Sequence, residues 1–261
     1  MSDMGRRVVM LLMLALLPAF SSSAQYRDGA AYRELDDSET VASLKSQVRY
    51  LSSAMLEGRK AGSEGEKLAA AYVTQTLRSY GVDVLSPADG EVFGLKTENG
   101  DTLTSRNVLG FVQGYDKNLR DRYIVVGARL DNLGSMTMTV DGNPVDKIFY
   151  GANGNASGLA IMLELARMVH TNSIMFRRSV LFVAFGASME TFAGSWYFLN
   201  RSFSDVDNID AMINLDMLGT GYNGFYAYTA SNADLHALLR TQTGELQPIL
   251  PDLTAQEPYP S

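Results

Sequence analysis

The chain has 261 residues, with 22 lysines and arginines against 29 aspartates and glutamates, a formal net charge of -7 and no cysteine. The acidic balance argues against nucleic acid and anionic membrane surfaces as partners, because both attract basic proteins. The lack of cysteine excludes disulfides, thiolate zinc sites and a lipid-modified amino-terminal cysteine.

The first 24 residues have the pattern of a secretory signal peptide. Arg6 and Arg7 precede the apolar stretch VVMLLMLALLPAF, and the small polar run SSSA follows it. The apolar stretch is shorter than the ~20 residues that a membrane span needs, so we favour cleavage over a permanent anchor. We predict an exported protein, periplasmic or extracellular, with no stable membrane span after signal removal. A flexible mature terminus is expected at 25–40 and a single α/β domain at 41–261.

Helices and strands alternate through most of the chain. Helical spacing of apolar residues predicts helices over 38–55, 64–80, 156–170, 195–201 and 232–239. Runs of β-branched and apolar residues predict strands at 107–113, 122–128, 179–185, 210–215 and 224–229, and a hairpin within 136–150 that turns at Asp141-Gly142. This order predicts a three-layer α/β fold, with a central, mostly parallel (mixed) sheet and helices on both faces.

Four polar segments follow predicted strands or open predicted helices. They are ARLDNLG, GANGNASG, FGASMETFAGS and NLDMLG, and the first carries Arg129 and Asp131 directly after a strand. Open α/β sheets bind ligands just past the carboxyl ends of their strands. These segments are therefore the candidate site.

Together with LSSAMLEGRKAGSEGEKLAAAYVTQTLRSYGV and SRNVLGFVQG, these segments resemble metallopeptidase family twenty-eight. That family comprises the co-catalytic zinc aminopeptidases and includes glutamate carboxypeptidases. The resemblance runs over residues 45–220, with six blocks in the family's order. It implies a zinc-aminopeptidase-like fold, and in active members hydrolysis of peptide bonds at two zinc ions.

The resemblance also implies that three zinc ligands have been replaced. Arg129 stands where the family has a histidine ligand, and Gly154 where it has the aspartate that bridges both metals. Met189 stands where it has a glutamate ligand. A guanidinium has no lone pair to give a metal and repels a dication. The three substitutions therefore predict a degenerate metal site without zinc.

Few functional groups of the family pattern are left. Asp216 is the only retained ligand, Asp131 keeps the position of the aspartate that orients the family's histidine ligand, and the general-base position is Ser188. We find no counterpart for the family's last histidine ligand, and His170 and His236 fit ordinary helix positions. The residues expected to line one pocket are Arg129, Asp131, Asn153, Ser188, Glu190 and Asp216.

Three interpretations follow. The first is an exported, catalytically inactive pseudo-peptidase that acts in binding or assembly with an unidentified protein or peptide partner. The second is an active metal-dependent aminopeptidase with an altered ligand set of Asp131, Glu190 and Asp216. Such a site would hold zinc or, with oxygen ligands alone, a harder cation. The third is that the sequence, which ends at Ser261, lacks the carboxyl-terminal part of the domain.

Two ion pairs are predicted. We expect the Arg129 guanidinium to contact Asp216 or Asp131 and to replace the charge of the lost cations, rather than turn to solvent. If that pair is partly buried, its loss should cost a few kcal/mol. In the EGR turn we expect an internal ion pair between Glu57 and Arg59.

Overall fold

The computed structural model describes residues 38–97, 99–219, 226–228, 233–243 and 252–254. The predicted signal peptide lies outside these residues. The first described helix begins at Glu39, so the end of the segment predicted to be flexible, 25–40, is helical instead. Within the described ranges, no helix is long and apolar enough to cross a membrane.

The longer helices begin where the sequence predicts them. Serine caps start two of them, because Ser38 Oγ accepts a hydrogen bond from the Val41 amide and Ser63 Oγ from the Glu66 amide. The α-helices are α3 (Glu39–Leu51), α4 (Glu64–Ser79), α5 (Ser157–Thr171), α6 (Ala193–Tyr197) and α7 (Ala233–Thr243). Short helical turns are η1 (Ala54–Leu56), η2 (Ala152–Ala156), η3 (Ser173–Met175), η4 (Phe198–Ser202) and η5 (Val206–Asn208).

The predicted strands are present with boundaries shifted by a few residues, and β9 covers part of the range 224–229. The strands are β1 (Asp83–Val84), β2 (Glu91–Lys96), β3 (Thr102–Val112), β4 (Tyr123–Arg129), β5 (Gly134–Val140), β6 (Asn143–Phe149), β7 (Ser179–Phe185), β8 (Ile209–Leu215), β9 (Tyr226–Tyr228) and β10 (Asp252–Thr254). The predicted hairpin is β5 and β6, and it turns at Asp141-Gly142 as expected.

The central sheet has the order β1-β3-β7-β4-β8, with β2 also paired to β3. Strands β7, β4 and β8 run parallel, whereas β3 is antiparallel to β7, β1 and β2. The α/β class with a mixed sheet is confirmed, and its parallel part is limited to β7, β4 and β8.

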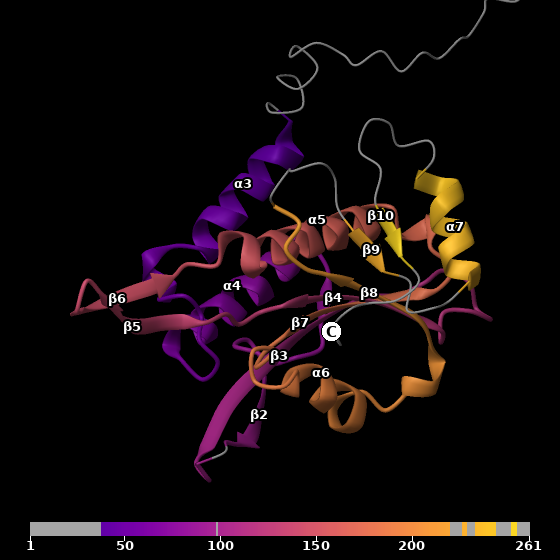
Figure 1. Cartoon of the computed structure of the whole chain (residues 1–261). Coiled ribbons are helices and arrows are strands. Elements are labelled where there is room, and N and C mark those ends of the chain that lie inside the picture. The colour runs from indigo at the N-terminus through magenta and orange to yellow at the C-terminus, as the bar shows by residue number, and fades with distance from the viewer. Residues whose placement is uncertain (1–37, 98, 220–225, 229–232, 244–251, 255–261) are drawn as a thin grey trace, which may run out of the picture.

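Helices cover both faces of this sheet (Figure 1). α3, α4 and α5 lie on one face and α6 lies on the other. Successive side chains of β4 point to opposite faces of the sheet. Val126 and Ala128 pack with α4 and α5, whereas Val125 packs with Phe198 of η4. β7 is buried throughout, in agreement with its nearly unbroken apolar sequence.

A buried carboxyl group links the start of α4 to β3. Ser105 Oγ donates to Glu66 Oε1 at 2.5 Å, and the Gly62 amide donates to Glu66 Oε2 at 2.8 Å. Glu66 is fully buried, and this burial raises its pKa from 4.5 to about 7 against the effect of both hydrogen bonds.

This pKa shift predicts a pH-dependent stability. Because the folded pKa lies above the unfolded one, the folded state holds the extra proton between pH 4.5 and about 7. Stability should therefore fall as pH rises through that window, by at most ~1.4 kcal/mol per pH unit. Glu66→Gln, which mimics the protonated acid, should flatten this decline in urea unfolding measured from pH 4.5 to 8. The matched control is Glu64→Gln at an exposed position of the same helix turn, and equal pH slopes for Glu66→Gln and the parent would contradict the assignment.

Candidate functional site

The candidate site lies where three parallel strands end together. In the register of the sheet, Arg129 pairs with Phe185 of β7, and Ala128 pairs with Leu215 of β8. Arg129 is the last residue of β4, and Asp216 directly follows β8. The two side chains therefore leave neighbouring strands at the same edge of the sheet.

Arg129 and Asp216 form an ion pair. Arg129 donates to Asp216 Oδ1 from Nη2 at 2.8 Å and from Nε at 3.2 Å. The side chain of Arg129 is 15% exposed and that of Asp216 is 40% exposed. The predicted contact is confirmed, with Asp216 as the partner. The third nitrogen, Nη1, lies 3.1 Å from the sulfur of Met189.

Asp131 has a structural role in the site. It is fully buried and accepts hydrogen bonds from the amides of Ser188 at 2.7 Å and Met189 at 3.0 Å. Burial raises the pKa of this carboxyl group, while the two amides oppose the shift by stabilising the charged form. Asp131 thus holds the turn that follows β7 against the end of β4.

Gly154 faces the guanidinium of Arg129. A Cβ atom at this glycine would lie 3.7 Å from Arg129 Nη2 and 4.0 Å from Met217 Cγ. These are ordinary contact distances, so a side chain at this position would point at the ion pair. Arg129, Gly154, Met189 and Asp216 therefore come together, as the resemblance predicts.

Two asparagines of η2 bind the chain that follows β8. Asn153 Oδ1 accepts from the Gly219 amide at 2.7 Å, and Asn155 Oδ1 accepts from the Met217 amide at 3.0 Å. Asn155 Nδ2 also donates to the Leu215 carbonyl at 2.9 Å. The sequence marked Asn153 as a pocket residue but missed Asn155, whose amide fixes the backbone next to Asp216.

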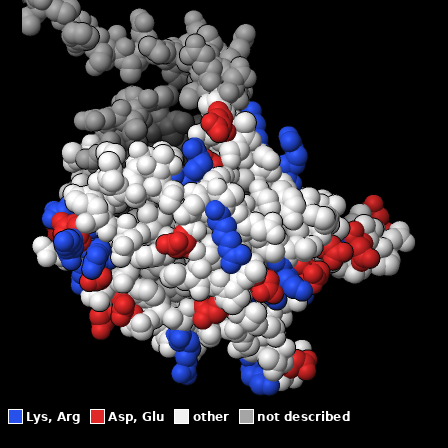
Figure 2. Space-filling view, turned by 180° about the vertical axis from the view of Figure 1, so that it is seen from behind, with Lys and Arg blue, Asp and Glu red and all other residues white. Residues whose placement is uncertain are grey.

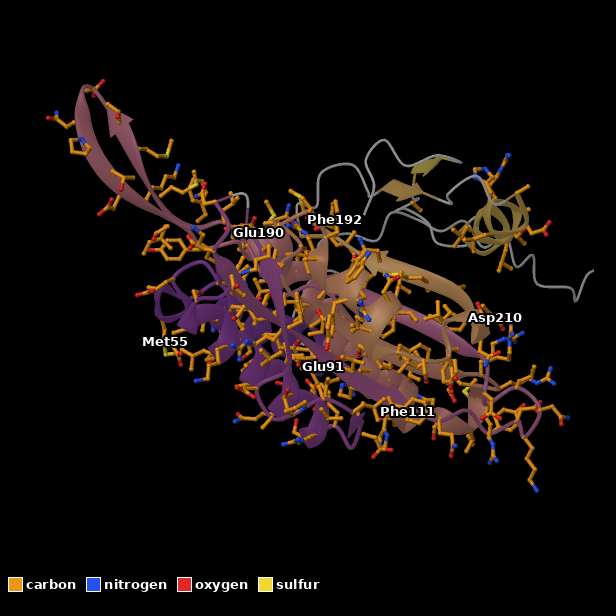
Figure 3. All side chains as sticks on the ribbon, turned by 90° about the horizontal axis from the view of Figure 1, so that it is seen from below. Met55, Glu91, Phe111, Glu190, Phe192 and Asp210 are labelled. Atoms are coloured by element: carbon orange, nitrogen blue, oxygen red, sulfur yellow. The ribbon has the colours of Figure 1, made fainter. Side chains whose placement is uncertain are left out.

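Ser188 and Glu190 lie in the turn after β7. The Ser188 hydroxyl donates to the Phe185 carbonyl at 3.1 Å, and the Glu190 amide donates to the Ala187 carbonyl at 3.2 Å. Figure 3 places Glu190 at the end of the molecule from which the β5–β6 hairpin projects, far from Asp210 near the start of β8. The position that the resemblance assigns to the general base thus carries a hydroxyl bonded to its own strand.

A residue that sequence reasoning misjudged is Arg59. The predicted Glu57–Arg59 ion pair is wrong, because Glu57 is exposed and the fully buried Arg59 donates to main-chain carbonyls. Its partners are the carbonyls of Leu51, Leu130 at 3.2 Å, Tyr150 at 3.0 Å and Gly151 at 3.1 Å. Burial lowers its pKa to about 10, and the nearby charge of Asp131 opposes that change. The EGR sequence indicated a structural turn at Arg59, but it did not indicate which groups Arg59 contacts.

Residues 107–258 match the sequence pattern of Peptidase family M28. This match covers more than half of the 261-residue chain. The chain belongs to peptidase family M28.

Two relatives of similar sequence are named aminopeptidases. Aminopeptidase YwaD of Bacillus subtilis (strain 168) is 29% identical over 148 residues, which is 50% of this chain and 29% of that protein. Aminopeptidase NAALADL1 of Mus musculus is 30% identical over 136 residues, which is 50% of this chain and 16% of that protein. The matched segment is therefore less than a third of either relative.

Solved structures share the M28 fold at low identity. Glutaminyl cyclase from Porphyromonas gingivalis has a TM-score of 0.65 at 21% identity, covering 78% of this chain and 71% of that one. BSAP, a zinc aminopeptidase from Bacillus subtilis, has a TM-score of 0.60 at 17% identity, covering 82% and 79%. Because two chemistries occur on one fold, the likeness by itself selects neither.

The residues of this M28 chain do not fit a zinc ion beside Asp216. Zinc needs several nitrogen, sulfur or carboxylate ligands, and here a fixed guanidinium contacts the retained carboxylate. Among the residues that the structure describes, no group of three or more His, Cys, Asp or Glu side chains is placed to hold a metal. That includes the alternative set of Asp131, Glu190 and Asp216.

Replacing Arg59 tests its role as a structural anchor. Arg59→Met should lower the free energy of unfolding by about 3 kcal/mol or more, because it leaves several buried carbonyls without donors. Urea unfolding of the variant, with Lys60→Met at the neighbouring exposed position as control, measures this. A variant as stable as the control would mean that water replaces the guanidinium at little cost.

Replacing Arg129 tests the ion pair. Because Asp216 keeps access to water when its partner is removed, Arg129→Ala should cost about 1 kcal/mol, less than the sequence alone suggested. Urea unfolding at low and high salt measures the change, which salt should reduce. A variant that unfolds like the parent in both conditions would make Arg129 energetically neutral.

Proposed function

We propose that this M28 chain is an exported, catalytically inactive family member that acts in binding or assembly with a protein or peptide partner. The observation that carries this proposal is the ion pair between Arg129 and Asp216. It occupies the place at the sheet edge where the family resemblance expects a metal centre. Export is supported by the signal-like pattern of the first 24 residues.

The ion pair opposes metal-dependent hydrolysis for an electrostatic reason. A guanidinium carries a positive charge and has no lone pair to donate, and this charge lies where a dication would have to enter. It also uses Asp216 Oδ1 as its acceptor. Hydrolysis in the family uses a water molecule bound at an open coordination position of a metal ion. The Arg129–Asp216 ion pair offers no such position.

Hydrolysis also needs a group that removes a proton from water. Ser188 has a hydroxyl at the position that the resemblance assigns to that group, and a neutral serine is a poor base. Its proton is directed at the Phe185 carbonyl. Among the described residues of this sheet edge, three ligand positions and the base position of the family reaction therefore carry other residues.

The alternative is an active peptidase with Asp131, Glu190 and Asp216 as ligands. Asp131 opposes this, since its carboxylate is fully buried and bound by two main-chain amides. Turning it toward a metal would leave the amides of Ser188 and Met189 without acceptors. The alternative therefore requires a rearrangement of the turn after β7.

The surface supports a partner other than nucleic acid. Acidic and basic side chains are interspersed over the face seen in Figure 2, with no broad basic area on that face. With an acidic chain overall, this distribution does not favour polyanions. A protein or peptide remains the partner class that we propose.

Metal content and peptidase activity test the proposal. After incubation with zinc and desalting, the purified chain should hold no stoichiometric zinc and should not cleave aminoacyl substrates. Arg129→His, Gly154→Asp and Met189→Glu should each leave hydrolysis absent, because each restores one ligand only. Arg129→Lys is the matched control for Arg129→His, since it keeps the charge and offers no lone pair at neutral pH. About two zinc ions per parent chain with chelator-sensitive cleavage would overturn the proposal and favour the active alternative.

A further inference from the structure

The β5–β6 hairpin projects from the body of the molecule as an arm (Figures 1 and 3). Its strands form a two-stranded sheet of their own. The turn residues Asp141 and Gly142 have φ angles of 50° and 82°, which suits the tight Asp-Gly turns of two-residue hairpins. At its base, the Gly134 amide donates to the Gly58 carbonyl at 3.1 Å. The arm is thus a regular element held to the body only at one end.

The two faces of the arm differ. One face carries Ser135, Thr137 and Thr139 on β5, and the Thr137 hydroxyl donates to Asp146 on β6 at 2.6 Å. On the other face, Asn143 and Lys147 of β6 flank a patch of four apolar side chains, which remain 40% to 50% exposed. This apolar face consists of Met136, Met138, Val140 and Val145, with Met138 directly opposite Val145.

Exposed apolar residues continue onto the body at the base of the arm. Leu133 precedes β5, Tyr150 follows β6, and both side chains are exposed. Met55 on η1 is also exposed and lies at the same end of the body as the arm in Figure 3. Exposed apolar side chains are therefore present on one face of the arm and also at its base.

A two-stranded hairpin by itself is only marginally stable in water, and a contiguous exposed apolar area marks an interaction site. We propose that the apolar face of the arm packs against the same face of a second copy of this chain. The two arms would stack about a two-fold axis near Met138, pointing in opposite directions. Met138 would then meet its own counterpart, and Met136 would meet Val140.

The charges on the arm favour this arrangement. Lys147 lies opposite Met136 near the base, with its Nζ 5.4 Å from the centre of the Phe149 ring, and Asp141 lies at the tip. Opposed arms bring Lys147 of each copy to the tip of the other, so that two cation–carboxylate contacts form. Arms stacked in the same direction would bring the two Asp141 residues together and crowd both bodies at one end. A closed two-fold contact uses one surface twice, as a self-complementary face requires.

This inference is independent of the state of the site. The arm's apolar face shares no residue with the Arg129–Asp216 ion pair, and a dimer is compatible with an inactive or an active chain. Loss of the proposed function would therefore leave the dimer proposal unaffected.

Sedimentation of the purified chain at several concentrations tests the dimer. The parent should be dimeric at tens of micromolar, and Met138→Glu should raise the dimer dissociation constant at least about tenfold. Thr139→Glu is the matched control, because it places the same charge on the polar face of the same strand, and it should leave the constant unchanged. Equal far-UV circular dichroism and melting would show that both variants fold. A parent that stays monomeric, or a Met138→Glu variant that dimerises as the control does, would overturn the proposal.

A charge cycle tests the orientation of the arms. Asp141→Asn should weaken the parent dimer by removing the partner of Lys147. In a Lys147→Glu background the same Asp141→Asn change should strengthen the dimer, because it removes a repulsion. Asparagine tolerates the positive φ of this turn, so the hairpin is retained. An Asp141→Asn effect of the same sign in both backgrounds would overturn the opposed stacking.

Discussion

The buried guanidinium of Arg59 is the interaction on which the arrangement of the site depends. It joins the end of α3, the segment after β4 and the segment before α5, because its donors reach carbonyls in all three. Arginine suits this place, since its planar group offers several donors in fixed directions and accepts no hydrogen bond. A buried charge without a carboxylate in contact is costly, and its lowered pKa reports that cost. The arginine therefore stabilises the fold only while every carbonyl stays in place.

A second arginine lies at the sheet edge where the family resemblance expects a metal centre. Two carboxylate-bearing strand ends at one sheet edge need a positive charge nearby, and Arg129 supplies one to Asp216. Asp131 is hydrogen-bonded to main-chain amides instead, and the charge of Arg129 also opposes the rise in the pKa of Asp131 that burial causes. At this edge Arg129 balances the charge of Asp216, and main-chain amides hold Asp131 in place. A glycine facing the guanidinium leaves room for that side chain.

Main-chain contacts hold the M28 scaffold together at the candidate site. Its sheet edge is built by main-chain register and by asparagines such as Asn155, which fix loops irrespective of a bound metal. Among solved structures with this fold are a glutaminyl cyclase and a zinc aminopeptidase. The reaction depends on a few side chains at that edge, whereas the fold depends on the many buried ones beneath it. Replacing the few leaves the scaffold intact.

Local patterns in the sequence determined most of the elements and the neighbours at the site. Serine caps, apolar periodicity and the Asp141-Gly142 turn act over a few residues, so helices, strands and the hairpin could be predicted. The contact of Arg129 with Asp216 or Asp131 was expected from the family resemblance, which places their segments at adjoining strand ends, and the structure has Asp216 as the partner. The tertiary structure alone decided the antiparallel pairing of β3 with β7, the carbonyl partners of Arg59 and the uncovered face of the hairpin. The first two features join residues that are distant in the chain, and the third depends on what packs against the hairpin. Periodicity within one segment contains no information about contacts with other segments.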